Sequence, residues 1–377
     1  MRGAPAWVRL LGVAALALHA EAAVCGPEQD AEDRFEEARA RPAPGAQKGN
    51  WVFVPIPVAN PTVGNGLQLA ALYLHPKRPG EEGAPAATSG IAGMATDQGS
   101  RLLGAFHDGS LANDQYRVSA FGGYGKFNLR FYGVGDSAPN VSDNPLPYIV
   151  EGALLQLRGE ARLVDNDRWF AGATYQFVDS SFTLETQQVL PGLPNLAAHF
   201  RSAGFGPHAT YDSRDSNYYP RSGQHFRIGW LNYGPTWGGD FRFDKGDVFY
   251  NHYLPFGDTS VLGLRARYQA ASKDTPFLFL PTLDMRGFSR DRYRDARTLS
   301  FTSEWRQKFH PRWGYVAYAE AGRIAPTMRE LNDARTIATL GAGLRWQVTA
   351  ERDMHLGLDA AFSSDDRAVF IQIGERF

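Results

Sequence analysis

The chain has 377 residues, a formal net charge of −1 and an aromatic content of 13%. After the N-terminal region it has no apolar stretch of about eighteen residues, so it offers no transmembrane helix, and so balanced a charge gives no reason to expect a nucleic-acid partner. A soluble β-sandwich or propeller stays open as a fold. A closed membrane barrel fits better, because strands that show only half their residues to lipid combine a polar average with many aromatic residues.

The N-terminal residues have the pattern of an export signal. Arg2 and Arg9 supply positive charge, residues 10–18 form a short apolar core, and Ala20-Glu21-Ala22 fits the small-residue rule for cleavage. We therefore predict a signal peptide over residues 1–22.

A short segment separates the signal from the strand-rich part of the chain. Residues 23–50 are too few to bury a core of their own, and we predict a periplasmic linker there, in which the charged stretch 28–41 could form a short helix. Cys25 is the only cysteine, so no internal disulfide can form. Because Val24 occupies the place where lipidation normally wants a small residue, an incidental thiol is favoured over a lipidated N-terminus. Residues 51–377 are uniform in composition and form the predicted outer-membrane β-barrel.

Sixteen stretches of about ten residues alternate apolar with polar side chains between Gly66 and Phe377, which is the pattern of strands that span a membrane. Short turns alternate with longer loops, and a last strand that descends to the periplasm puts the short turns on that side. The predicted periplasmic turns are residues 97–99, 125–126, 164–167, 220–223, 255–258, 310–312 and 350–353. The predicted extracellular loops are residues 75–85, 108–114, 136–147, 184–198, 234–239, 271–297, 324–335 and 363–367. This count predicts an all-β, 16-stranded antiparallel transmembrane barrel in the bacterial outer membrane.

Parity within each strand predicts which side chains face lipid, since successive residues point to opposite faces. In residues 260–269, Leu264 and its apolar neighbours point outward, while Arg267 and the other polar residues point into the lumen. The same rule puts Phe127 outside and Arg130 inside. The predicted lumen is charged and rich in arginine, which fits either a water-filled pore that prefers anions or a polar interior neutralised by an inserted loop.

The longest loop carries an unusual motif. Residues 271–297 contain Leu283-Asp284-Met285-Arg286-Gly287-Phe288, followed by a charged run. The next strands contain Ser303-Glu304-Trp305 and Tyr318-Ala319-Glu320-Ala321-Gly322, and parity places both glutamates on the inner wall. Further distinctive segments are residues 211–215 (Tyr-Asp-Ser-Arg-Asp), residues 341–346 (Gly-Ala-Gly-Leu-Arg-Trp) and residues 371–377 (Ile-Gln-Ile-Gly-Glu-Arg-Phe).

Together these segments resemble the BamA/TamA outer-membrane assembly superfamily, also called the bacterial surface antigen family, over about residues 51–377. That family has a (Val/Ile)-Arg-Gly-(Phe/Tyr) tip on a sixth extracellular loop that folds back into the barrel, and its chains end in a β-signal that contains glycine. Here Met285 replaces the branched residue, and Glu320 stands where the family has aspartate. We expect a barrel-only member without the periplasmic recruitment domains.

The resemblance implies a contact between the sixth loop and the barrel wall. Arg286, Gly287 and Phe288 would form the tip inside the lumen. Arg286 would make charge-assisted hydrogen bonds with Glu304 and Glu320, because a planar guanidinium suits bidentate carboxylates. The residues leave open whether such a contact is a fixed plug or a moving gate.

The resemblance also implies a seam at which the barrel opens sideways. We expect the first strand, near Gly66, to pair imperfectly with residues 368–377, because glycines such as Gly66 and Gly374 loosen a strand. Ile373, Gly374 and Phe377 would belong to the terminal signal.

Three function classes remain. The resemblance favours assembly or translocation of outer-membrane proteins, with outer-membrane lipid and a periplasmic partner protein or unfolded barrel clients as partners; the alternatives are a passive pore and a structural or surface-interaction barrel. We expect no cofactor, and no metal at Asp212 and Asp215, because the twelve-residue calcium pattern is absent. We expect no enzyme, because the chain has no Gly-X-Ser-X-Gly, His-Glu-X-X-His or phosphate-loop motif. A serine and a histidine that meet at the membrane surface are the alternative left open.

Overall fold

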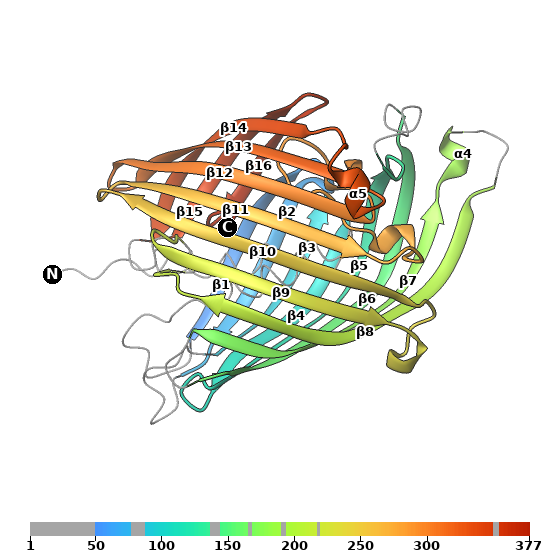
Figure 1. The fold of residues 1–377 in the computed structure, drawn as a ribbon, viewed down its shortest axis with the longest axis horizontal. Helices are drawn as coiled ribbons and strands as arrows, with labels where there is room; N and C mark the ends of the chain where they lie inside the picture. Colours follow the sequence, from blue (N-terminus) through green and yellow to red (C-terminus); the bar gives the residue numbers. More distant parts are fainter. Residues whose placement is uncertain are drawn as a thin grey trace.

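The computed structural model describes residues 50–76, 87–135, 144–164, 168–189, 194–216, 219–349 and 354–377. One antiparallel sheet of sixteen strands, in sequence order from β1 to β16, is rolled into a barrel (Figure 1). The predicted fold class is therefore confirmed. The predicted signal peptide and linker lie outside the described residues, apart from Asn50, with which β1 begins.

The strands are β1 (Asn50–Asn60), β2 (Gly64–Leu74), β3 (Thr88–Thr96), β4 (Arg101–Leu111), β5 (Tyr116–Phe131), β6 (Leu146–Arg162), β7 (Trp169–Leu184), β8 (Leu196–Asp212), β9 (Gly223–Tyr233), β10 (Phe243–Phe256), β11 (Ser260–Ala271), β12 (Arg297–His310), β13 (Trp313–Ala325), β14 (Ile337–Thr349), β15 (Met354–Ser363) and β16 (Arg367–Ile373). Short helical segments within the loops are α4 (Thr186–Val189), η3 (Pro235–Trp237), η4 (Phe277–Phe279), η5 (Arg290–Arg292) and α5 (Met328–Leu331). Among the described residues, no helix has the length and apolar character needed to cross a membrane.

The barrel has two different ends. At one end β1 begins and β16 ends, and the tight turns β10–β11 and β12–β13 lie there too (left in Figure 1); we call it the terminal end. The opposite end, which we call the loop end, carries α4, α5, η3 and the long connection 272–296. Outer-membrane barrels have short turns in the periplasm and long loops outside, so the loop end is the extracellular one.

The predicted strand boundaries are wrong in the first third of the barrel. Residues 125–126 form no turn, because they lie inside β5, where Gly125 pairs with Gly152. A Cβ on Gly125 would lie 2.3 Å from Cε2 of Phe127, so this glycine serves close packing within the strand rather than a turn. The strand β1 precedes the predicted first strand. Its Pro55 and Pro57 are residues more typical of loops than of strands, so the pattern predicts no strand there. The two errors cancel, which is why the total of sixteen was correct.

The same two errors put three connections at the wrong end. The turn 97–100, expected among the short periplasmic turns, joins β3 to β4 at the loop end. The connections β2–β3 and β4–β5, expected outside, lie at the terminal end. From β5 onward the strands begin and end at the predicted ends of the barrel; the predicted turn 350–353 lies outside the described residues.

Burial agrees with the predicted parity on several strands. Leu264 is 37% exposed on the outer face of β11, whereas Arg267 is 3% exposed on the inner face. On β9, Ile228 and Trp230 are exposed and Arg227 is buried. The outer surface is therefore apolar, and much of the inner surface is charged.

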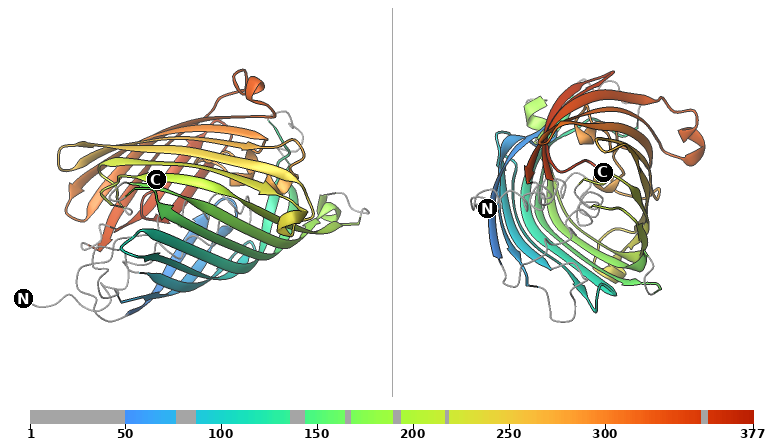
Figure 2. Two further views of the ribbon diagram at one scale, coloured as in Figure 1. Left: turned by 60° about the horizontal axis from the view of Figure 1, so that its bottom comes forward. Right: turned by 90° about the vertical axis from the view of Figure 1, so that its left-hand side faces the viewer.

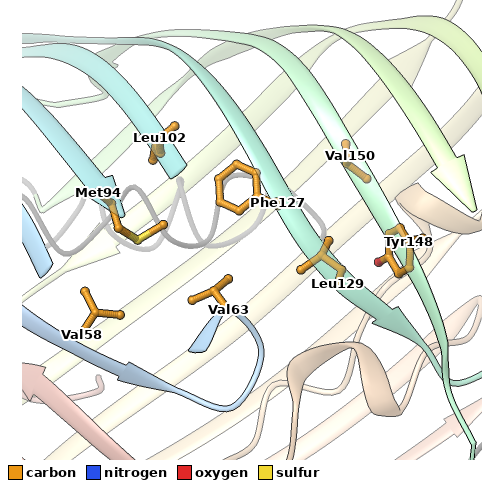
Figure 3. Packing of buried hydrophobic residues seen from close by; sticks show 8 residues of the cluster. All are labelled: Val58, Val63, Met94, Leu102, Phe127, Leu129, Tyr148 and Val150. Carbon is orange, nitrogen blue, oxygen red and sulfur yellow. The ribbon is translucent and has the colours of Figure 1, made fainter. Parts of the chain in front are cut away.

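The predicted inner and outer faces are reversed in the half of β5 near the loop end. Phe127 and Leu129 are buried in the lumen and Arg130 is exposed on the outside, the reverse of the prediction. The reason is that the lumen is not polar throughout: eight apolar residues from β1 to β6 form a buried cluster near the loop end, and Leu278 of the long loop packs against it (Figure 3). The cluster consists of Val58, Val63, Met94, Leu102, Phe127, Leu129, Tyr148 and Val150.

Candidate functional site

The sixth connection, residues 272–296, folds into the lumen as two antiparallel arms. Thr282 and Arg294 form an isolated antiparallel bridge, and the backbone N–H of Leu283 donates to the carbonyl of Tyr293 at 2.8 Å. The tip between these arms contains Arg286, which is fully buried. Backbone hydrogen bonds between the arms thus hold the tip at a defined depth.

An apolar cluster anchors the two arms to the wall. Leu283, Met285 and Phe288 pack with Ile324 of β13 and Ile337 of β14. Gly322 leaves room for these side chains at the wall, since a Cβ on this residue would lie 2.6 Å from Leu283 and 2.7 Å from the sulfur of Met285. Burial of apolar area in this cluster is what brings the charged tip against the wall.

Arg286 contacts three carboxylates of the inner wall. Its Nε donates to Glu320 at 3.0 Å, and its Nη1 donates to Glu304 at 2.7 Å and to Asp359 at 3.3 Å. Its backbone N–H also donates to Glu320 at 2.6 Å. The guanidinium carbon lies 3.2 Å from the centroid of the Tyr318 ring, so a cation–π contact adds to the hydrogen bonds.

The neighbouring carboxylates favour the charged form of Arg286. Burial alone would lower the pKa of Arg286, but the carboxylates of Glu320, Glu304 and Asp359 outweigh burial and raise the pKa above its ordinary value. The tip therefore keeps its positive charge near neutral pH.

Gly287 allows the chain to turn at the tip. Its φ is +98°, in the region that side chains rarely adopt, and a Cβ there would lie 2.8 Å from Cγ2 of Thr339. Phe288 follows, 1% exposed, with its ring edge-on to Tyr293 at 4.8 Å between centroids. The three predicted tip residues thus meet the wall in three different ways: ionic, steric and apolar.

The carboxylates have further arginine partners, which sequence reasoning missed. Arg306 donates from Nε to Glu304 at 2.9 Å, and Arg345 pairs with Asp359. All four side chains are at most 3% exposed. Because unpaired charges are costly to bury, the alternation of acids and arginines is what makes this network tolerable. Parity alone could have found Arg306, two residues after Glu304 on the same face.

The C-terminal tail turns into the lumen. Gly374 has a φ of +80°, and beyond it the chain leaves the line of β16; Figure 2, at right, shows the C-terminus within the outline of the barrel. Phe377 is 5% exposed and packs with Tyr253 and Val261. Its carbonyl accepts a hydrogen bond from Nη2 of Arg306 at 2.7 Å. Of the predicted terminal signal, residues 371–373 lie in β16 and pair with β15, whereas Gly374 and Phe377 lie beyond the strand.

Two ionic contacts join the tail to the network and to the sixth loop. Glu375 accepts from Arg345 at 2.9 Å, and Arg376 donates to Asp284 at 2.6 Å. Burial would raise the pKa of Asp284, but the charges of Arg376, Arg265 and Arg267 outweigh it and hold the pKa below its usual value. The loop, the inner wall and the tail therefore form one continuous charged assembly.

The seam of the barrel lies between β1 and β16. These strands lie side by side, yet they are the two edges of the sheet, and no ladder joins them among the described residues, whereas every other pair of neighbours is laddered. Gly66, predicted to line the seam, lies instead in β2, where it is opposite Val58 of β1 and Thr96 of β3. The structure thus places β1, and not the strand that contains Gly66, at the seam.

Two prolines remove donors from the β1 side of the seam. The carbonyl of Asn65 accepts from the N–H of Asp97, so Asn65 and every second residue of β2 face β3. Leu69 has this parity, and its opposite residue Pro55 must therefore face away from β2, toward β16. Pro57 has the same parity. The middle of β1 thus offers β16 carbonyl acceptors but no N–H donors.

Nowhere in the described ranges do three or more histidine, cysteine, aspartate or glutamate side chains converge on a point where a metal ion could bind. Asp212, considered as a metal ligand, instead accepts two hydrogen bonds from the guanidinium of Arg214, at 3.0 Å and 2.9 Å. The same turn uses the Asp215 carboxylate to accept from the backbone N–H of Arg221 at 2.9 Å.

Comparison with known proteins identifies the family. Residues 141–349, more than half of the chain, match the Omp85 superfamily domain. The chain belongs to the Omp85 superfamily. The matched part of this Omp85 barrel runs from β6 to β14, so it includes the sixth loop and both strands that carry Glu304 and Glu320. No protein with a curated description matches the chain.

Solved structures support the same assignment at the level of the fold. BamA from Haemophilus ducreyi lacking POTRA domains 1–3 is similar with a TM-score of 0.57 at 13% identity, covering 87% of this chain and 70% of that one. CdiB from Escherichia coli has a TM-score of 0.60 at 14% identity, with 85% and 62% covered, and CdiB from Acinetobacter baumannii has a TM-score of 0.56 at 12% identity, with 87% and 60% covered. The chain thus spans less than two thirds of the CdiB chains. As an Omp85 barrel, it is a protein of the bacterial outer membrane.

Proposed function

We propose that this Omp85 barrel takes part in the assembly or translocation of outer-membrane proteins, together with a partner, by opening between β1 and β16. The observation that carries the proposal is the seam, which is the one junction between neighbouring strands without a ladder among the described residues. An opened edge would offer an incoming strand unpaired backbone groups, which is how strands add to a sheet.

The prolines of β1 support a seam that can open. A full ladder along β1 and β16 would hold the barrel closed, since a lipid-facing backbone group without a partner is expensive. With Pro55 and Pro57 facing β16, the closed seam loses two hydrogen bonds in its middle. Closed and open states therefore differ by less free energy than they would at any laddered junction.

The filled lumen argues against a wide passive pore. Arg286 and the tail residues Glu375 and Phe377 are buried inside the barrel, so ions would have to pass the network that they form. We propose that Arg286, Gly287 and Phe288 hold the sixth loop in place while the seam moves. We propose no catalytic step for this site.

Crosslinks across the seam test the proposal. In a Cys25→Ser background, which has no native thiol, one cysteine replaces Phe53 or Pro57 and a second replaces Val369 or Ile371, whose backbones have the parity that faces β1. The full chain in liposomes is then given an unfolded outer-membrane barrel, and folding of that client is followed with and without reductant.

We expect seam crosslinks to stop client folding until reductant is added. A matched control joins Phe53 to Ala71, which are opposite each other in the laddered pair β1 and β2; this crosslink should leave client folding unchanged. Equal client folding with the seam open or crosslinked, or no acceleration over empty liposomes, contradicts the proposal. Conductance that survives every crosslink, without client folding, identifies a passive pore instead.

A further inference from the structure

The outward side chains of β5 show where the lipid-facing apolar surface of the barrel ends. They run from Tyr116 to Tyr124, which are 52% and 56% exposed, with only apolar or small side chains between them. This stretch is about 26 Å long along the strand and roughly 20 Å across the membrane after tilt, close to the apolar band of an outer-membrane barrel. Tyrosines at both ends fit the two aromatic girdles. Tyr124 therefore marks the headgroup level at the loop end.

Three cations lie just beyond this level on the outer face. Lys126 and Arg130 follow Tyr124 on the outward side of β5, and Arg101 begins β4 directly opposite Lys126. Arg101 and Arg130 are exposed and Lys126 is partly exposed. Like charges directly opposite each other on neighbouring strands repel, so the pair of Arg101 and Lys126 costs stability unless an anion joins it.

The protein itself supplies little compensation. Within the described residues, none of the three cations forms an ion pair or a side-chain hydrogen bond. Glu151 on β6 is opposite Lys126, but its carboxylate accepts from the hydroxyl of Tyr124 at 3.3 Å. Asp97, in the turn before β4, is bound by Asn65. The three positive charges thus outnumber these two carboxylates, both of which already accept hydrogen bonds.

We propose that the outer face of β4 and β5 at the loop end binds the phosphate groups of a lipid in the outer leaflet. Arginine forms bidentate bonds with phosphate, and lysine adds a point charge. The patch continues directly from the lipid-facing apolar surface, so acyl chains below and phosphates above would contact one lipid molecule together. This continuity favours a lipid over a soluble anion.

The spacing of the cations suits a headgroup with two phosphates. Arg101 and Lys126 are neighbours across the strands, while Lys126 and Arg130 are four residues apart, which is about 13 Å along the strand. One phosphate would bind between Arg101 and Lys126, and a second would reach Arg130. We therefore expect a bisphosphorylated, lipid-A-type headgroup to bind better than a lipid with a single phosphate.

Lipid binding to the purified full chain tests the proposal. Native mass spectrometry in detergent compares bisphosphorylated lipid A, dephosphorylated lipid A with the same acyl chains, and inorganic phosphate. We expect the bisphosphorylated lipid to bind at least about tenfold more tightly than the dephosphorylated one, since charge-assisted bonds to phosphate are the difference between them. This comparison uses the unchanged protein and does not depend on any variant that fails to fold.

Variants then locate the site. The triple variant Arg101→Gln, Lys126→Gln and Arg130→Gln should remove most of the preference for phosphorylated lipid. The control Arg201→Gln changes an outward arginine at the same end that already pairs with Asp240 at 3.1 Å, and it should leave lipid binding unchanged.

Three results would overturn the proposal. Equal binding of phosphorylated and dephosphorylated lipid would remove the role of phosphate. Full binding by the folded triple variant would place the lipid elsewhere. Inorganic phosphate that binds as tightly as the lipid would make the patch a site for a soluble anion.

Discussion

Replacing Arg286 with methionine removes the charge at the loop tip and keeps much of the side-chain volume. The three carboxylates around it are then affected unequally. Glu304 keeps Arg306 at 2.9 Å. Glu320 keeps only the backbone N–H of residue 286 and a distant hydroxyl, that of Thr302 at 3.5 Å. The free-energy cost of the substitution should therefore come mainly from Glu320.

The magnitude follows from the burial of these groups. Removing one partner of a buried ion pair costs about 3–5 kcal/mol. Since Asp359 retains Arg345, we expect Arg286→Met to lower the free energy of unfolding by about 3 kcal/mol, the lower end of that range. Adding Glu320→Gln to Arg286→Met removes the stranded carboxylate, and the double variant should cost less than the sum of the single ones by about 1–3 kcal/mol.

Equilibrium unfolding of the full chain in urea, in liposomes near neutral pH, measures these differences. The control is Arg335→Met, which removes an arginine that is 45% exposed and pairs with Asp365 at 3.3 Å; it should cost less than about 1 kcal/mol. An Arg286→Met variant within about 0.5 kcal/mol of the parent, or fully additive effects in the double variant, would refute the reasoning.

Two further predictions concern the loop tip and its neighbour. Gly287→Ala should lower the free energy of unfolding by about 1–2 kcal/mol, because φ is +98° and the new methyl would press on Thr339. The control Gly257→Ala, with φ of +66° and open space around it, should cost less in the same urea assay. A larger cost for Gly257→Ala than for Gly287→Ala would contradict the packing argument. Asp284 has a pKa below its usual value because Arg376 and other cations outweigh its burial, so the stability it adds is present above the unfolded-state pKa of about 4 and is lost as pH falls toward the folded-state value. The stability gap between the parent and Asp284→Asn should then be largest near neutral pH and shrink below about pH 4, and a gap independent of pH would contradict this.

Much of the barrel could be predicted from local pattern. The alternation of residues in β6, β9 and β11 has a period of two, which depends only on the geometry of a strand, so inward arginines such as Arg227 and Arg267 could be assigned before any fold was known. The predictions failed where the role of a residue depended on side-chain packing in the folded barrel rather than on the period of the strand. Gly125 looked like a turn because glycine is common in turns, but its small size makes room for Phe127.

The amino-acid pattern was sufficient for the fold class, for most of the inner and outer faces, and for the segments that meet in the lumen, because each of these follows from a short-range repeat or motif. The number of strands was right only because a missed strand, β1, offset a divided one, β5. It was not sufficient for the partners of the loop tip. Asp359 and Arg345 join Arg286 only when β14 and β15 close the wall, and the tail reaches Asp284 only because Gly374 turns the chain inward. The direction in which Pro55 faces is also a property of pairing register. Such contacts depend on closure of the barrel, which brings together residues that no local period relates.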